Sequence, residues 1–501
     1  MYKITWDEET GGVLLHPRIV DGTVGVPPRP VFYEELDLLK LNEHGWEYPH
    51  CEEPIMWAVN KQYYYRGKHV FDAKGANIYT EPTLEFENGI VPTVLLPVDM
   101  QKMLKRTSDL MFVLENEAIE FIRDIYTEYT KVNKTYDKAA ANKLDFEAMA
   151  NKLEKSSKKK MAVVKQDCDS FDIMPLDLAE SEGKKALLST KIDRFIASFS
   201  GGKDSQVVLD LCTRAIPPTD FEVIYSDTGY ELPPSLRLYE EVQDYYKQKF
   251  PALKFLMARN HESVLNYWDK IGTPSDTHRW CCSVMKTAPL YRMLKVEGNK
   301  QAHVLAFDGV RAEESTKRDG YQRVGRGKHT FVYNAHPILR WNSIEIFLYL
   351  FRYKLPINPA YRIGKARVGC LICPFSTGWD DMIVNKKYGN DLLPFVERLK
   401  EYSSQVKIAN FDNYLNERKW KLKPLGNRNL VTPKVHIKSD VKSLKFSAEI
   451  EDSRLKLLTW LPALCKFTIK EHKGGYQGEL YFINAKLLQK SEMRKDIVIE
   501  L

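Results

Sequence analysis

The chain has 501 residues, of which 44% are hydrophobic, 28% charged and 12% aromatic. This balance excludes a wholly disordered or collagen-like protein. The length allows about three average domains, and 74 Lys and Arg against 67 Asp and Glu give a mild net charge of +7. Eight cysteines are too sparse for a secreted disulfide scaffold, so their spacing carries more information than their number.

The N-terminus and the hydropathy pattern predict a cytoplasmic protein without a membrane segment. Glu8 and Glu9 stand where a signal peptide would carry its apolar core. No run of about 18 uncharged apolar residues occurs, so a membrane-spanning helix is not expected. In the reducing cytoplasm, clustered cysteines more often bind a metal or do chemistry than form disulfides.

The first 189 residues divide into two predicted parts. Residues 1–98 have the pattern of a strand-rich domain, in which runs such as Tyr63–Tyr65 suit a half-buried pleated surface. Residues 99–189 begin with a predicted helix, because apolar residues recur at spacings of three and four: Leu110, Leu114, Ala118, Phe121 and Ile125. Lysines then accumulate from Lys152 to Lys160, which indicates an exposed helix end or a basic linker, with a domain boundary between about 155 and 190.

Residues 190–385 change to short apolar runs that alternate with helical patterns. The runs include Phe195–Ala197, Val223–Tyr225 and Val304–Phe307. Continuous apolar runs of this length are typical of buried parallel strands, so we expect an α/β domain built on a βαβ sheet. Residues 386–501 are predicted to form a basic, strand-rich C-terminal domain, with apolar runs near Val435 and Lys466 and a turn at Gly474–Gly475.

A pair of glycines follows the first of these runs, in the sequence Ser200-Gly201-Gly202-Lys203-Asp204-Ser205. Two glycines let the backbone turn tightly and approach a ligand closely. The helical pattern after the loop would direct free N–H groups and a positive dipole end at it, which suits an anion such as phosphate. Lys203 and the hydroxyls of Ser200 and Ser205 can add donors. Asp204 favours a Mg²⁺ ion between its carboxylate and the phosphates.

This six-residue string resembles the S-G-G-K-D-S loop of the PP-loop ATP-pyrophosphatase, or adenine nucleotide alpha-hydrolase, superfamily. It matches neither the Walker A spacing nor the dinucleotide-binding pattern. The resemblance implies a PP-loop domain with a doubly wound parallel sheet and an adenine nucleotide at residues 200–205. Members that use ATP cleave it between the α and β phosphates, and the same cleavage is implied here.

Further segments are similar, in the same order, to the phosphoadenosine/adenosine phosphosulfate reductase family within that superfamily. They are Ser226–Tyr230, Arg279–Cys282 with Lys286 and Pro289-Leu290, Gly309–Ser315 with Arg318, His336–Ile338, Trp341, Pro356–Pro359, Tyr361 and Gly369-Cys370. The similarity covers roughly residues 190–380.

The family resemblance also implies roles for single residues. Asp227, Thr228 and Gly229 would contact the nucleoside or Mg²⁺, since ligands collect at the carboxyl ends of parallel strands. Arg311 and Arg318 would hold phosphate or sulfate oxygens with their planar guanidinium donors. The residues expected to serve catalysis are therefore Lys203, Asp204, Arg311 and Arg318.

The cysteines include an adjacent pair, Cys281-Cys282, and a distant C-x-x-C formed by Cys370 and Cys373. Four thiolates suit an iron–sulfur cluster or zinc, because both favour sulfur ligands. An adjacent pair fits the usual zinc template of two C-x-x-C pairs poorly, and unliganded redox thiols are a third interpretation. Adenylylsulfate reductases carry a similar set that ligates a [4Fe–4S] cluster, and this resemblance implies the same cofactor here.

The resemblance ends near the C-terminus. Phosphosulfate reductases carry a catalytic cysteine in an E-C-G-x-H type segment, whereas Cys465 is the only cysteine after Cys373 here. Cys465 lacks the following glycine and histidine and stands in an apolar run, so it is interpreted as a core thiol, as is Cys212. Cys51 and Cys168 receive no role. His336, which precedes a proline, is interpreted as structural.

A basic stretch lies between Arg418 and Lys438. It contains seven Lys and Arg residues, no acidic residue, and one interleaved aromatic residue, Trp420. Such a segment attracts a phosphate backbone, and its aromatic ring can stack on a base. The stretch therefore predicts nucleic acid as a partner, with a solvated basic loop as the alternative.

Together these observations predict an iron–sulfur PP-loop enzyme that cleaves ATP between the α and β phosphates for sulfur transfer. Nucleic acid is the candidate acceptor, and a sulfur-donor or electron-donor protein is a candidate partner. The first alternative is an adenylylsulfate or phosphoadenylylsulfate reductase, in which a sulfonucleotide takes the place of ATP. The second is a nucleotide-sensing protein that binds nucleic acid without turnover.

Overall fold

The structure is a computed structural model. It describes residues 2–19, 26–131, 146–167, 170–184, 186–188, 192–296, 300–327, 329, 331–406 and 408–422, with strands at 435–439, 444–448, 465–472, 475–482 and 497–500. Contacts divide the chain into two units: residues 1–261 with 280–394, and residues 262–279 with 395–501. Across the described ranges, no helix is both long and apolar enough to cross a bilayer.

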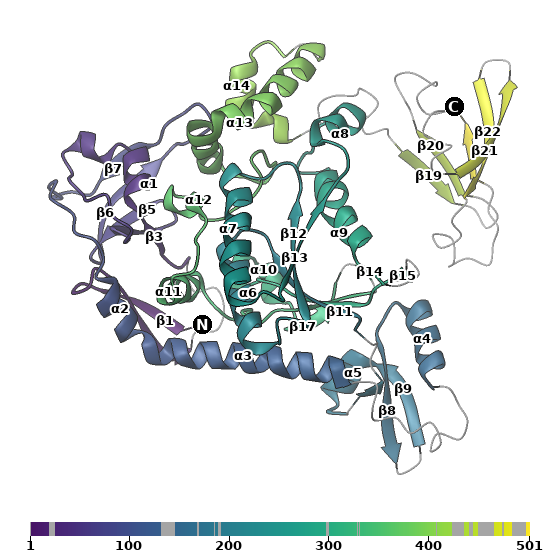
Figure 1. Cartoon of the computed structure of the whole chain (residues 1–501). Coiled ribbons are helices and arrows are strands. Elements are labelled where there is room, and N and C mark those ends of the chain that lie inside the picture. The colour runs from purple at the N-terminus through teal and green to yellow at the C-terminus, as the bar shows by residue number, and fades with distance from the viewer. Residues whose placement is uncertain are drawn as a thin grey trace. The chain divides into compact units, whose positions relative to one another are not determined.

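Short strands build the N-terminal part, as the sequence predicts (Figure 1). An antiparallel hairpin of β1 (Tyr2–Asp7) and β2 (Gly12–Ile19) comes first. A five-stranded antiparallel sheet follows, ordered β3 (Arg29–Val31), β4 (Met56–Val59), β5 (Gln62–Tyr65), β6 (Lys68–Lys74) and β7 (Thr83–Phe86). It is accompanied by α1 (Tyr33–Leu38) and a 3₁₀-helix at Leu41–His44. Tyr63 is fully buried in β5, as expected for a packing role.

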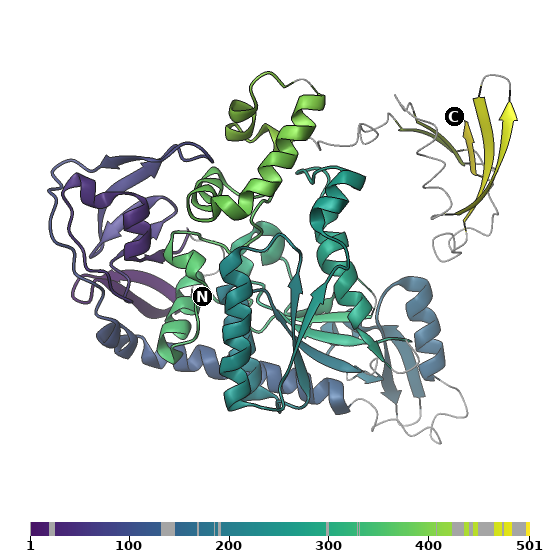
Figure 2. The ribbon, with the colours of Figure 1, turned by 45° about the horizontal axis from the view of Figure 1, so that its top comes forward.

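The predicted helix is present as α2 (Met100–Arg106) and α3 (Ser108–Lys131). Asp99 caps α2, because its side chain accepts a hydrogen bond from the Lys102 backbone N–H at 3.0 Å. Ala118 and Ile125, from the apolar stripe, are buried. In Figures 1 and 2, α3 is the long blue helix that runs beside the central sheet.

Of the two interpretations of the lysines from Lys152 to Lys160, the exposed helix end is confirmed and the linker is not. The lysine-rich residues end α4 (Phe146–Ser157), and a small folded element follows. It contains β8 (Met161–Asp167), β9 (Ser170–Pro175), β10 (Ala186–Leu188) and α5 (Leu176–Ser181), with the strands ordered β10-β8-β9. The sequence prediction followed the lysines and missed the strand that begins with the apolar run Met161–Val164. The side chains of this run are all buried.

The expected α/β sheet forms the centre of the first unit. Its six strands are ordered β13 (Lys254–Arg259), β12 (Phe221–Asp227), β11 (Arg194–Phe199), β16 (Val304–Phe307), β18 (Val332–Ala335) and β17 (Val324–Arg326). All neighbours pair in parallel except β17, which is antiparallel to β18. The buried apolar runs of the sequence therefore became a mainly parallel sheet, as predicted.

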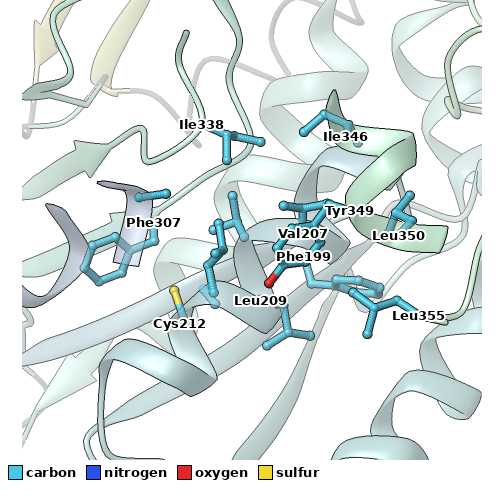
Figure 3. Close-up of a cluster of buried hydrophobic side chains, with 14 of the residues drawn as sticks. Phe199, Val207, Leu209, Cys212, Phe307, Ile338, Ile346, Tyr349, Leu350 and Leu355 are labelled. Atoms are coloured by element: carbon cyan, nitrogen blue, oxygen red, sulfur yellow. The ribbon is translucent and has the colours of Figure 1, made fainter. Parts of the chain in front are cut away.

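Helices cover both faces of this sheet. Side chains of α6 (Lys203–Ala215), α7 (Pro233–Lys249) and α11 (Ser343–Tyr353) pack with α3 on one face. Figure 3 shows part of this core, where Val207 and Leu209 of α6 lie among Phe199, Phe307 and residues of α11. On the other face, α9 (Ala288–Met293) packs on the alternate strand positions Ile196, Ile224 and Ala306.

The remaining elements are shorter or lie beyond the sheet. In the first unit they are the hairpin β14 (Lys295–Val296) and β15 (Lys300–Gln301), a π-helix at Cys282–Thr287, a 3₁₀-helix at Ala312–Glu314, α10 (Thr316–Asp319) and α12 (Pro359–Arg362). α13 (Gly378–Gln405) consists of two helical segments that meet at Tyr388. α13 therefore runs through position 386, where the sequence suggested a domain boundary.

The second unit combines two separate parts of the chain. It contains α8 (Val264–Ile271), α14 (Phe411–Asn416) and a 3₁₀-helix at Lys419–Lys421. Trp268 of α8 stacks edge-on against Phe395, with ring centroids 5.5 Å apart. The predicted strand-rich tail is confirmed by a sheet ordered β19 (Val435–Ser439), β20 (Leu444–Ala448), β23 (Ile497–Glu500), β22 (Gly475–Phe482) and β21 (Cys465–His472).

Candidate functional site

The candidate site lies where the strand order of the central sheet reverses. From β11 the chain passes through α6 to β12 on one side, and β16 pairs with β11 on the other side. Ligands of open α/β sheets bind at the carboxyl ends of the strands at such a switch point. The phosphate loop follows β11, Asp227 ends β12 and Asp308 follows β16, so all three stand at this edge.

The phosphate loop is preformed by its own glycines and hydroxyls. Gly201 has φ +71°, a conformation that a side chain would strain. The Ser205 hydroxyl donates to the Gly202 carbonyl at 2.9 Å and accepts from the Ser200 backbone N–H at 3.2 Å. No side chain caps α6, which begins at Lys203. The loop thus presents a helix N-terminus to the crevice, which favours an anion.

Three charged residues of the loop and of the segment after β16 form a buried network. Asp204 accepts from the Lys203 ammonium at 3.0 Å and from the Arg311 Nε at 2.6 Å. Burial alone would raise the pKa of Asp204, but Arg311 and Lys203 outweigh it and lower the pKa to about 2. Burial lowers the pKa of Lys203 despite this carboxylate. Asp204 is therefore a buried anion held by two cations.

Asp227 and its neighbours build a turn at the end of β12. The Asp227 carboxylate is 1% exposed and accepts from the Gly229 backbone N–H at 2.8 Å and the Arg259 Nε at 2.6 Å. The Thr228 hydroxyl donates to Glu231 at 2.8 Å, and Gly229 has φ +72°. The residues predicted to contact the nucleoside therefore lie at the carboxyl edge of the central sheet, as expected. Their hydrogen bonds fix the conformation of the turn after β12.

Arg318 stands on the opposite side of the switch point, in α10. Its guanidinium pairs with Glu314 on the preceding turn and is partly buried. Burial and the nearby Arg367 lower the pKa of Arg318, while Asp308 and Asp204 oppose that shift. Arg311 therefore contacts the phosphate loop through Asp204, whereas Arg318 pairs with Glu314, and its role in holding an anion stays a prediction.

Two residues of the matched segments acquire roles that the sequence did not predict. The Asn358 side-chain amide donates to the Gly201 carbonyl at 2.9 Å and to the Ser235 hydroxyl at 3.0 Å. The buried Tyr361 hydroxyl accepts from the Lys203 backbone N–H at 3.0 Å. The sequence placed both residues in the family pattern, but only long-range contacts show that they support the phosphate loop.

The predicted cluster cysteines share one electrostatic neighbourhood. A hydrogen bond with Cys282 and burial raise the pKa of Cys281, and nearby Cys370 and Cys373 add to the shift. None of the four forms a disulfide. Within the part of the chain that the structure describes, no three His, Cys, Asp or Glu side chains are close enough to hold a single metal ion.

The C-x-x-C segment is attached to the end of β12. Cys370 forms a β-bridge with Glu231, and the Leu371 N–H donates to the Tyr230 carbonyl at 2.5 Å. Burial raises the pKa of both Cys370 and Glu231, and the ammonium of Lys286 opposes each shift. The C-x-x-C segment is therefore adjacent to the carboxyl edge of the central sheet, where the phosphate loop also lies.

The other residues singled out in the sequence have simpler surroundings. Cys212 is fully buried, which agrees with a core thiol. The Cys51 thiol donates to the Glu53 carbonyl. His336 is buried, with Nδ1 2.5 Å from a carboxylate oxygen of Asp308, which agrees with a structural role. Cys168 and the side chain of Cys465 lie outside the described residues.

The basic stretch is only partly described. Residues 423–434 lie outside the described residues, so its unopposed charges stay a prediction. The expectation that Trp420 is available to stack on a base is wrong. Its ring is 4% exposed and the Lys421 ammonium lies 5.3 Å from the ring centre, because the 3₁₀-helix turns this side chain inward.

Comparison with known proteins supports the family pattern. A model of the phosphoadenosine phosphosulfate reductase domain matches residues 194–376. An uncharacterised protein of Methanocaldococcus jannaschii is 30% identical over 234 residues, which are 46% of this chain and 45% of that protein. An adenosine 5'-phosphosulfate reductase of Bacillus cytotoxicus is 26% identical over 188 residues, which are 37% of this chain and 75% of that enzyme.

These similarities cover limited parts of the proteins. The chain spans about half the length of the first curated relatives it matches. A crystal structure of phosphoadenylyl-sulfate reductase from Candida auris aligns with 35% of this chain and 81% of its own, at 19% identity and a TM-score of 0.28. That likeness is too weak to support an argument about function.

Proposed function

Because the chain belongs, through residues 194–376, to the phosphoadenosine phosphosulfate reductase family of enzymes, we propose that it is an iron–sulfur PP-loop enzyme of sulfur transfer. In this proposal it cleaves ATP between the α and β phosphates. Nucleic acid is the acceptor, as the basic stretch from Arg418 to Lys438 suggests. A donor protein supplies the sulfur.

The observation that carries the proposal is the continuous connection between the phosphate loop and the cysteines. The Tyr361 hydroxyl accepts from the backbone N–H of Lys203 in the loop at 3.0 Å, and the backbone of Val368 opposes the rise that burial causes in the pKa of the same hydroxyl. Two residues after Val368, Cys370 is bridged to Glu231 beyond the end of β12. A nucleotide in the loop and a group held by the cysteines would therefore share one edge of the sheet.

The loop residues suit α–β cleavage, because that reaction releases a highly charged leaving group. An oxygen of the acceptor would attack the α-phosphorus, the bond to the bridging oxygen would break, and pyrophosphate would leave with the electron pair. The acceptor proton goes to solvent. Lys203, Arg311 and the free start of α6 stand where they can stabilise this charge. A sulfur nucleophile would then displace AMP from the acceptor.

The magnesium ligands expected from the sequence do not fit a metal site as they stand. Asp204 is held by Lys203 and Arg311, and Asp227 is held by Arg259 and the Gly229 N–H. We therefore assign no step to a metal bound by these carboxylates. The positive charge at the phosphates comes from the protein's own cations and helix N-terminus.

The thiols fit an iron–sulfur cluster by their chemistry, because such clusters favour thiolate ligands. The proposed ligands are Cys281, Cys282, Cys370 and Cys373. Zinc is the alternative, and its usual template of two C-x-x-C pairs fits the adjacent pair Cys281-Cys282 poorly. When bound, such a cluster would supply electron transfer or an iron that holds sulfur.

A second candidate is reduction of a sulfonucleotide. It is favoured by the 26% identity to an adenosine 5'-phosphosulfate reductase over 75% of that enzyme. That chemistry needs an accessible thiolate to attack sulfur. Cys465 is the only cysteine after the C-x-x-C, so it is the thiol to test.

The test is anaerobic purification of the full chain, followed by iron and sulfide analysis and by product analysis with ATP and each sulfonucleotide. We expect about four irons per chain. From ATP and nucleic acid we expect pyrophosphate, and AMP once sulfide is added as the sulfur nucleophile. Cys370→Ser should lose the iron, whereas the matched control Cys51→Ser should keep it, because Cys51 is remote in sequence and bonded to Glu53.

Other products would point elsewhere. ADP and phosphate from ATP would refute α–β cleavage. Sulfite from a sulfonucleotide, abolished by Cys465→Ser, would support the reductase instead. Tight binding of adenine nucleotides without turnover, with nucleic acid and donor proteins present, would favour a nucleotide sensor. Zinc in place of iron would remove the cluster from the proposal.

A further inference from the structure

Both ends of the loop that carries the C-x-x-C enter the core of the five-stranded N-terminal sheet. This cysteine loop spans residues 364–380 and contains Cys370 and Cys373. Ile363 precedes the loop and Trp379 lies at its end, and both are buried in one hydrophobic cluster with residues of β4 and β6. Helix α12, which leads into the loop, lies beside α1 (Figure 1). The N-terminal sheet therefore holds the chain on both sides of the cysteines.

The start of the cysteine loop rests on a buried carboxylate of α1. Gly364 has φ +93°, and a β-carbon at this position would lie 2.6 Å from Cδ of Glu35. Glu35 is fully buried, and its two oxygens accept from Nη1 and Nη2 of Arg29 at 2.6 Å each. The Tyr63 hydroxyl donates to the same carboxylate at 2.6 Å. Because Glu35 is held by these bonds, a side chain at position 364 would displace the loop.

A buried ion pair joins the two ends of the loop. The Lys365 ammonium donates to Oδ1 of Asp380 at 2.8 Å, and Lys365 is 3% exposed. The other carboxylate oxygen of Asp380 accepts from the backbone N–H and the hydroxyl of Thr377, at 3.0 and 2.7 Å. Next to this pair, the Trp379 indole N–H donates to the Gly364 carbonyl at 2.9 Å. Two direct contacts therefore clamp the first two residues of the loop to its last two.

Hydrogen bonds connect this clamp to the cysteines. The Ser376 hydroxyl donates to the Cys373 carbonyl at 2.8 Å, and its oxygen lies 2.5 Å from a carboxylate oxygen of Asp381 in the first turn of α13. The Ser376 backbone N–H donates to the same carbonyl at 3.1 Å. Cys370 is held from the other side by its β-bridge to Glu231. Both cysteines are therefore attached to fixed parts of the fold.

Such fixation matters for a group that binds several side chains at once. A loop that is already ordered loses less conformational entropy when the group binds to it. Replacing residues that hold metal ligands from behind typically weakens metal binding by about 10–100-fold. The family match covers residues 194–376, so Glu35 and Asp380 lie outside it. Part of the support for the cysteine loop therefore comes from beyond the family domain.

We propose that the N-terminal sheet and the Lys365–Asp380 pair position the cysteine loop, so that Cys370 and Cys373 are held ready to bind the cluster. This inference rests on the proposed function, which assigns a cluster to these cysteines. Glu35, Lys365 and Asp380 are positioning residues, because they act through the loop. The inference gives the N-terminal sheet a role in metal binding.

The test compares full-length variants that are purified anaerobically. Lys365→Met leaves a buried carboxylate unpaired, so we expect it to lose iron to a chelator about 10–100-fold faster than wild type. Lys365→Met/Asp380→Asn should lose iron more slowly than Lys365→Met, because it leaves no buried charge. Once the iron is removed, mass spectrometry measures how fast iodoacetamide alkylates Cys370 and Cys373. This rate should be at least about tenfold higher in Lys365→Met than in wild type, because local opening exposes the thiols.

Two glycine variants form a matched pair. Gly364→Ala and Gly75→Ala both place a side chain at a positive φ, +93° and +82°. Only the first would press on Glu35, because no atom of the described residues lies within 4 Å of a β-carbon at Gly75. We expect Gly364→Ala to share the faster loss of iron and the faster alkylation, and Gly75→Ala to behave as wild type. The affinity of Lys365→Met for a non-cleavable ATP analogue, measured by calorimetry, should be unchanged, since the phosphate loop stays intact.

The outcomes separate this inference from the proposed function. Unchanged alkylation rates in iron-free Lys365→Met and Gly364→Ala would overturn the inference, as would an equal loss of iron from Gly75→Ala. A fall in affinity for the ATP analogue in step with the loss of iron would also overturn it, because that result indicates general destabilisation. Faster alkylation of the two variants, in a protein that holds no iron even when purified anaerobically, would instead refute the cluster of the proposed function and leave the positioned loop standing.

Discussion

Replacing Tyr361 by phenylalanine removes the one oxygen that joins the phosphate loop to the cysteine segment. That oxygen accepts from the Lys203 backbone N–H at 3.0 Å. Tyr361 is 3% exposed, so water has little access to this donor. A buried donor without a partner costs about 1–3 kcal/mol, so the variant should lose at least about 1 kcal/mol of stability.

Thermal denaturation and nucleotide binding measure this effect. A domain of roughly 200 residues shifts by about 2–4 °C for each kcal/mol, so the midpoint of Tyr361→Phe should fall by at least about 2–4 °C. Its affinity for ATP should also fall, by about tenfold, because the loop is no longer held in its binding conformation. The matched control is Tyr239→Phe, a buried tyrosine of α7 whose hydroxyl makes no hydrogen bond within the described residues. A midpoint within 1 °C of wild type, at about the precision of such scans, together with unchanged ATP affinity, would refute the reasoning.

Two further predictions test the packing around the loop and a buried carboxyl group of α11. In Gly309→Ala the new methyl carbon would lie 2.8 Å from the Asp204 carbonyl carbon and 2.9 Å from the Ser205 nitrogen. The first turn of α6 must then shift, so ATP affinity should fall at least about tenfold by calorimetry, and wild-type affinity would contradict the contact. Burial raises the pKa of Glu345 to about 7, against the backbone N–H bonds of Asn342 and Tyr2. The folded state then binds this proton more tightly than the unfolded state, so the protonated carboxyl adds to the free energy of unfolding. This addition is complete below about pH 4.5 and is lost as the pH rises to about 7. Denaturation midpoints between pH 5 and 8 should fall less steeply in Glu345→Gln than in wild type, and parallel pH profiles would contradict the prediction.

Local sequence patterns were sufficient to predict the conformation of the phosphate loop and the positions of the strands around it. A glycine pair between an apolar run and a helical pattern has few alternative conformations, and the loop with φ +71° at Gly201 is the expected one. The apolar runs became parallel strands because a strand buried on both faces needs apolar residues throughout. The segments after β11, β12 and β16 meet at one edge because these strands are parallel neighbours in the sheet. This placement brings Arg311 into contact with Asp204 of the phosphate loop.

Patterns dominated by charge were less informative. The lysines after position 151 concealed a buried strand at Met161–Val164, because surface charge on one element says little about the next element. Trp420 was expected at the surface among basic residues and is buried instead. In both cases packing of apolar atoms, which sequence charge does not report, decided the conformation.

Local patterns were enough to indicate the family similarity, the phosphate loop and the two cysteine pairs, since each depends on residue types at short and fixed spacing. Only the tertiary structure decided which side chains meet across long distances in the chain. Asp204 is paired with Arg311, 107 residues away, and Lys203 is bonded to Tyr361, 158 residues away. Such pairings arise from the register of strands and the packing of helices, and no local pattern encodes them.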